Sequence, residues 1–183
     1  MKTPSFNVSN FYGRLWIVIT IFTVLFIGTK PIMKAMFPIR YAEEIQQYST
    51  YYNVDEHLIM AVISAESKFN KYAVSCKGAK GLMQIRDKTA LWCMEKFGID
   101  GDIEDIHNPE LNINIGCAYM AYLLDKFVGD TATAVAAYNA GEGNVKKWLG
   151  GKASITNDDI LFKETENYVK KVSERKNIYK FLY

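Results

Sequence analysis

The sequence predicts a mainly α-helical domain preceded by an N-terminal transmembrane helix. Two observations lead to this prediction. An uncharged, mostly apolar run of fifteen residues extends from Leu15 to Thr29. After residue 41, apolar residues recur at helical spacing and strand signals are weak. We therefore divide the 183 residues into an N-terminal signal-anchor or transmembrane segment (1–29), a linker (30–40) and a folded domain with room for one core (41–183).

The apolar N-terminal run is short for a hydrocarbon core of about 30 Å, because a helix rises about 1.5 Å per residue. Including Phe11 and Tyr12, with Arg14 reaching toward the headgroups, brings the run close to spanning length. The run would also serve as the apolar part of a secretory signal, but no small-residue cleavage motif follows it at once. We expect an uncleaved anchor in the cytoplasmic membrane, with the domain on the extracytoplasmic side of the cell envelope. Secretion after signal cleavage is the alternative.

Proline and capping residues mark the beginning of the domain. Pro31 and Pro38 indicate the short linker. A first helix is expected from Ala42 to Tyr52. The next is expected from Leu58 to Phe69, and Asp55 stands where its side chain can cap the first turn.

Capping signals also place the later helices. Asp87 is a candidate cap for a helix that stops near Gly98. The pair Asn108-Pro109 is typical of a cap followed by the first helical residue, and the helix that it opens should run to about Phe127. Further helices are expected at 131–138, where Thr131 or Thr133 would be the starting residue, at 144–149 and at 164–182.

Charge and cysteine spacing exclude two classes of function. Of the 22 basic residues, five precede Glu43 in a stretch without acids, so the rest carries 17 basic against 20 acidic residues. Such a balance is not typical of a nucleic-acid-binding domain. The cysteines at 76, 93 and 117 form neither a CxxC pair nor a cluster with His57 or His107, which argues against zinc. One disulfide is possible, but we expect buried free thiols.

Glu66 is the first candidate for chemistry, because it falls inside the apolar stripe formed by Ile59, Val62 and Ile63. Burying a carboxylate is costly, so such a residue usually has a partner or a function. In an apolar cleft, desolvation would favour its protonated form and make it a general acid. From spacing alone a structural explanation is favoured, in which Glu66 lies solvated or paired with a lysine at the rim of a core helix.

Three other segments could line a site, although each has an ordinary structural explanation. Segment 78–84 is rich in glycine, which lets the backbone approach a ligand closely, but it could also be a simple turn. Segment 137–141 places a Tyr-Asn pair at a helix end, where the Asn could be only a cap. Glu164 suits the start of the last helix because of the helix dipole, and with Tyr168 one turn later it could also face a cleft.

Together these segments match one family. The matching residues, in order, are Glu66-Ser-x-Phe69, Ser75 with Gly78-Ala-x-Gly-Leu-Met-Gln84, Asn108-Pro109, Asn112-Ile113, Gly116, Ala136-Ala-Tyr-Asn-Ala-Gly141, Gly143-Asn-Val145 and Glu164-Thr-x-x-Tyr-Val-x-x-Val172. In order and spacing they resemble the catalytic core of the soluble lytic transglycosylases, whose fold is lysozyme-like (goose-type). The resemblance covers about residues 41 to 175. Two segments depart from the family pattern: Arg86-Asp87 stands where Met-Pro is common, and Leu161-Phe162-Lys163 lacks a Pro that is common before the Glu-Thr motif.

The resemblance implies that residues 41–183 are a lytic transglycosylase catalytic domain. It implies Glu66 as the catalytic acid/base. It also implies a set of substrate-binding residues: Ser75, Met83, Gln84, Tyr138, Asn139, Glu164 and Tyr168. The reaction would cleave the β-1,4 bond between N-acetylmuramic acid and N-acetylglucosamine in peptidoglycan without water, leaving a 1,6-anhydro-muramic end. No cofactor or metal is implied, and the expected partners are peptidoglycan strands and the cytoplasmic membrane. The alternatives are a muramidase-type hydrolase and a peptidoglycan-binding module of an envelope machine.

Overall fold

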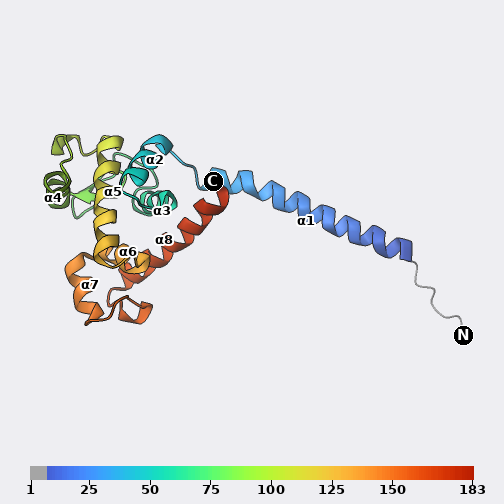
Figure 1. The fold of residues 1–183 in the computed structure, drawn as a ribbon. Coiled ribbons are helices and arrows are strands. Elements are labelled where there is room, and N and C mark those ends of the chain that lie inside the picture. Colours follow the sequence, from blue (N-terminus) through green and yellow to red (C-terminus); the bar gives the residue numbers. More distant parts are fainter. Residues whose placement is uncertain (1–7) are drawn as a thin grey trace, which may run out of the picture. The chain divides into compact units, whose positions relative to one another are not determined.

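The computed structural model of the protein describes residues 8–183, except the side chains of residues 8–11, 21, 22 and 24–27. The chain forms two compact units. One comprises Met1–Pro38 with Leu182, and the other comprises Ile39–Phe181 with Tyr183. Figure 1 shows the single long helix of the first unit and the helices of the second.

The first unit contains helix α1 (Val8–Met36), which has Pro31 within it. The helix continues through residues 30–36, which the sequence assigned to a linker. In the part of the chain that the structure describes, no helix is both long and apolar enough to cross a membrane. The transmembrane helix predicted within residues 1–29 is therefore not supported, and its first seven residues lie outside the described chain.

The second unit is mainly α-helical, as predicted. Its helices are α2 (Ala42–Tyr51), α3 (Glu56–Glu66), α4 (Asp87–Phe97), α5 (Pro109–Lys126), α6 (Thr131–Ala140), α7 (Glu142–Leu149) and α8 (Lys163–Leu182), with short 3₁₀ turns at Ile103–Asp105 and Asn157–Asp159. Two-residue strands β1 (Ala79–Lys80) and β2 (Ile85–Arg86) pair antiparallel, with Ala79 opposite Arg86. The glycine-rich segment is thus the tip of a small hairpin.

Two of the predicted helix caps are confirmed. The Asp55 side chain accepts a hydrogen bond from the backbone N–H of His57 at 2.9 Å, at the start of α3. The Asn108 side chain accepts one from the N–H of Glu110, also at 2.9 Å, at the start of α5. Each pairs a backbone N–H that has no acceptor within its own helix.

Helix α6 begins at Thr131, one of the two predicted starting residues, and the Asp130 side chain caps it by accepting from the N–H of Thr133 at 2.7 Å. Two other predicted helix boundaries differ from the structure. Asp87 is the first residue of α4 and not its cap. Helix α3 ends at Glu66 instead of Phe69, because Lys68 and Phe69 adopt positive φ values of 52° and 62° that a right-handed helix does not allow.

The core forms around α3 and α5. Helix α5 contacts α2, α4 and α6 (Figure 1). Helix α3 is buried on all sides from Leu58 to Ser64. Its last residue, Glu66, therefore lies at the end of a core helix and not on a helix that runs along the surface. Cys93 and Cys117 are buried in this core, Cys76 is exposed, and all three thiols are free.

Candidate active site

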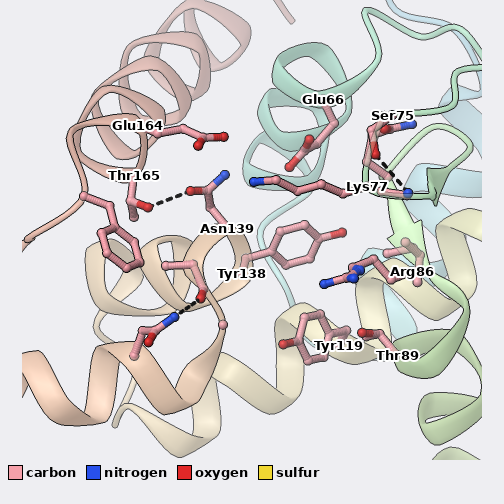
Figure 2. A pocket seen from close by; sticks show the side chains of 17 residues that line it. Glu66, Ser75, Lys77, Arg86, Thr89, Tyr119, Tyr138, Asn139, Glu164 and Thr165 are labelled. Carbon is pink, nitrogen blue, oxygen red and sulfur yellow. Dashed lines mark hydrogen bonds between the residues drawn. The ribbon is translucent and has the colours of Figure 1, made fainter.

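A cavity of about 500 Å³ lies where the end of α3 meets the hairpin, α5, α6 and the start of α8 (Figure 2). It brings together six of the eight residues that the sequence predicted for the site. They are Glu66, Ser75, Gln84, Tyr138, Asn139 and Glu164. Because these residues come from five separate segments of the chain, only the folded domain assembles them.

The position of Glu66 is fixed by contacts between α8 and the last turn of α3. The end of a helix leaves carbonyl groups without intrahelical partners. Here Lys171 donates from Nζ to the Ala65 carbonyl at 3.1 Å, and Arg175 donates to both the carbonyl and the hydroxyl of Ser64. Two cations of α8 therefore satisfy the end of α3, where they are also favourable to the helix dipole.

The surroundings of Glu66 raise the pKa of its carboxyl group. Burial is the largest cause, because it penalises the charged form, and the charge of Glu164 acts in the same direction. The Tyr168 hydroxyl and the Lys171 ammonium favour the carboxylate and lower the pKa, but by less than burial raises it. The Tyr168 hydroxyl is buried but forms no hydrogen bond of regular geometry with a described residue, so its lowering of the Glu66 pKa is weak. Glu66 therefore holds its proton to a higher pH than an exposed glutamate.

The hairpin that forms one wall of the cavity is held by Asn112 of α5, whose side chain is fully buried. Its Oδ1 accepts from the N–H of Met83 at 2.8 Å, and its Nδ2 donates to the carbonyls of Lys80 at 3.1 Å and Ile106 at 2.9 Å. Gly81 has a φ of 79°, and a Cβ there would lie 2.2 Å from Asn112 Nδ2. The approach of hairpin to helix therefore requires both the glycine and the amide.

Met83 does not line the cavity, although the resemblance implied that it binds substrate. Its side chain is fully buried beneath the hairpin, and a Cβ on Gly116 of α5 would lie 2.1 Å from its Sδ. The Met83 carbonyl accepts a hydrogen bond from the hydroxyl of Tyr138 at 2.8 Å. Met83 thus supports the wall and orients a residue that does line the cavity.

Hydrogen bonds orient the polar side chains of the two sides of the cavity. Gln84 donates from Nε2 to the carbonyls of Ala73 at 3.1 Å and Gly81 at 3.0 Å, and Ser75 Oγ accepts from the N–H of Ala79 at 2.9 Å. These bonds fix the hairpin side of the site.

On the opposite side, Asn139 Oδ1 accepts from the hydroxyl of Thr165 at 2.7 Å. With its oxygen engaged, Asn139 presents its amide nitrogen to the cavity as a donor (Figure 2). Tyr168 lines a smaller adjoining hollow of about 310 Å³, together with Glu66 and Glu164. The predicted residue therefore approaches Glu66 from outside the main cavity.

Several residues that sequence reasoning did not assign also line the cavity. They are Lys77, Arg86, Thr89, Tyr119, Asn144, Phe162 and Thr165, with four small or apolar neighbours. Two of them, Arg86 and Phe162, belong to the segments that depart from the family pattern. That departure was the one signal in the sequence that could have found them.

Comparisons with known proteins agree with this geometry. Residues 43–160 match the sequence profile of the family described as Transglycosylase SLT domain. The soluble lytic murein transglycosylase of Escherichia coli K12 is 35% identical over 147 residues, which cover 76% of this chain and 23% of that protein. The membrane-bound lytic murein transglycosylase C of Photorhabdus laumondii is 36% identical over 116 residues, covering 58% of this chain and 32% of that protein.

The fold agrees as well. The crystal structure of the 70 kDa soluble lytic transglycosylase of E. coli superposes with a TM-score of 0.76 at 35% identity, covering 81% of this chain and 25% of that chain. This chain thus spans about a quarter to a third of the length of these relatives. The mainly helical fold is accordingly the lysozyme-like fold that the resemblance implied. The chain belongs to the Transglycosylase SLT domain family.

Proposed function

We propose that the protein is a peptidoglycan lytic transglycosylase that cleaves the β-1,4 bond between N-acetylmuramic acid and N-acetylglucosamine. The observation that carries this proposal is Glu66, a carboxyl group with a raised pKa in a cavity lined by hydrogen-bonding side chains. Membership of the family supports the same activity. The names of the relatives, which are lytic murein transglycosylases, support peptidoglycan as the substrate.

In the proposed first step, protonated Glu66 donates its proton to the oxygen of the scissile bond as that bond breaks. The raised pKa keeps a larger fraction of Glu66 protonated near neutral pH, which is the state that a general acid needs. The positive charge that develops at C1 of the muramic acid is stabilised by the sugar's own 2-acetamido group or by the polar walls of the cavity.

In the proposed second step, the Glu66 carboxylate removes the proton from the C6 hydroxyl of the muramic acid. The C6 oxygen then bonds to C1 and closes the 1,6-anhydro ring, while Glu66 regains its proton. The group thus acts first as acid and then as base, and no water is consumed. Lys171 favours the carboxylate form that exists between the two steps.

A muramidase-type hydrolase is the second candidate, because the structure places another carboxylate in the same cavity. Glu164, at the start of α8, lines the cavity with Glu66. Ordinary glycoside hydrolysis uses two carboxyl groups, one of which activates water or attacks C1. Glu164 would have that role in a hydrolase, whereas in a transglycosylase it would contribute to binding and to the raised pKa of Glu66.

We also propose that the protein acts in the cell envelope, which the names of its soluble and membrane-bound relatives support. Attachment to the cytoplasmic membrane through the N-terminal segment, with the domain on the extracytoplasmic side, rests on the uncharged run from Leu15 to Thr29 alone. Fractionation of cells before and after a carbonate wash tests it. An anchored protein stays in the membrane pellet, and recovery in the wash contradicts the attachment.

The mass of the product separates the candidate activities. The full-length protein is incubated with purified peptidoglycan, and the released fragments are analysed by mass spectrometry. A transglycosylase releases anhydro fragments that are lighter by one water than the reducing-end fragments of a hydrolase. A peptidoglycan-binding module releases neither.

A further inference from the structure

Two cationic side chains enter the cavity from the hairpin side. Lys77 precedes β1 and Arg86 is the last residue of β2, and both side chains point into the cavity (Figure 2). A smaller adjoining hollow of about 350 Å³ is lined by the same two residues and by Lys88. The cavity thus continues into a region where positive charge collects.

Two carboxyl groups, Glu66 and Glu164, line the same cavity, but neither is ion-paired with these cations. Neither Lys77 nor Arg86 forms an ion pair or a side-chain hydrogen bond with any residue that the structure describes. The one acid that lines the adjoining hollow, Asp87, is held by Lys80 at 2.9 Å. Glu164 lies across the cavity from Arg86 in Figure 2. An anion entering beside Arg86 would therefore meet a guanidinium that no described residue pairs, in a cavity that Lys77 also lines.

We propose that Lys77 and Arg86 form a subsite for a carboxylate group of the glycan strand. This inference rests on the proposed function, since peptidoglycan strands carry carboxylates on their peptides or, where the peptide is absent, on the lactyl group of the muramic acid. A guanidinium matches the geometry of a carboxylate with two parallel N–H donors, and an ammonium adds a point charge. The subsite would hold the strand while Glu66 acts on the neighbouring glycosidic bond.

The subsite belongs to this chain rather than to the general pattern of the family. Arg86-Asp87 stands where Met-Pro is common. The substitution provides the guanidinium, and the ion pair between Asp87 and Lys80 removes the charge that would otherwise compete for it. Lys77 and Arg86 therefore add a preference for anionic strands to a cavity whose other ionisable carboxyl groups are Glu66 and Glu164.

Binding measurements in an inactive background test the subsite. The full-length protein with Glu66→Gln is titrated by calorimetry with three soluble preparations of glycan strands. The first bears peptides, the second has lost them and keeps the lactyl carboxylate, and the third bears peptides whose carboxylates have been converted to amides. The variants Arg86→Gln and Lys77→Gln are compared with Lys147→Gln, which removes one charge from an exposed position of α7 outside the cavity.

We expect Arg86→Gln and Lys77→Gln each to weaken binding to carboxylate-bearing strands about 3- to 10-fold, and Lys147→Gln to leave it unchanged. All variants should bind amidated strands alike. If the variants lose affinity only for peptide-bearing strands, the bound carboxylate belongs to the peptide. If they lose as much affinity for peptide-free strands, the bound carboxylate is that of the lactyl group. The proposal is overturned if Arg86→Gln and Lys77→Gln bind carboxylate-bearing strands as tightly as the parent protein does. It is also overturned if they lose as much affinity for amidated strands as for carboxylate-bearing strands. Failure of the proposed function would be seen separately, because the parent protein with Glu66 intact would then release no anhydro product from peptidoglycan.

Discussion

Replacing Asn112 with alanine removes the amide that holds the hairpin against α5. Three backbone groups would lose this partner, namely the buried N–H of Met83, the buried carbonyl of Ile106 and the partly buried carbonyl of Lys80. A buried polar group left without a partner costs about 1–3 kcal/mol. Because water can reach the side of the hairpin that faces the cavity, we use the lower part of that range. The free energy of unfolding should then fall by about 3–5 kcal/mol, a large part of the 5–15 kcal/mol typical of a domain.

Urea unfolding of the full-length protein, followed by circular dichroism, measures this loss. With a slope of about 2 kcal/mol per molar urea, the midpoint should fall by about 1.5–2.5 M. The control is Asn177→Ala on the exposed surface of α8, where alanine should change stability little or raise it slightly. A loss below about 1 kcal/mol for Asn112→Ala would refute the reasoning, since the hairpin would then be held by other contacts.

Two further predictions concern packing and charge. Gly116→Ala should lower the free energy of unfolding by about 1–3 kcal/mol, because its Cβ would lie 2.1 Å from Met83 Sδ in a buried site. The control in the same urea titration is Gly143→Ala, whose Cβ would meet nothing within 4 Å and which should be neutral or stabilising. The raised pKa of Glu66 means that the unfolded chain releases this proton more readily than the folded chain, so the group costs stability as pH rises above its ordinary value of about 4.3. Glu66→Gln should therefore gain stability relative to the parent between pH 4 and pH 7, and a constant difference across that range would contradict the shift.

The helices of the domain could be predicted largely from the sequence because their signals are local. Asp55 and Asn108 cap helices within three residues of themselves, and a local pattern contains that information. The hairpin could not be predicted in this way. Its strands are two residues long, and they pair because Asn112, about thirty residues away, holds the segment between them.

The candidate site was predicted in its residues more fully than in its geometry. Spacing placed Glu66 on an apolar stripe but could not say that its helix ends there, which is what exposes the carboxyl group to the cavity. The motif containing Met83 does not indicate which of its side chains face the cavity and which face the core. In the structure the Met83 side chain is buried in the core. Lys77 was not predicted because a charged residue in a loop has no signal for direction, and the only signal for Arg86 was its departure from the family pattern.

The central claim is that Glu66 acts as both acid and base in a cleavage that consumes no water. The direct test is mass spectrometry of fragments released from purified peptidoglycan by the full-length protein and by its Glu66→Gln variant. We predict anhydro fragments from the parent and no release by the variant, which should keep the same circular dichroism spectrum. Fragments heavier by one water, or undiminished release by Glu66→Gln, would contradict the account.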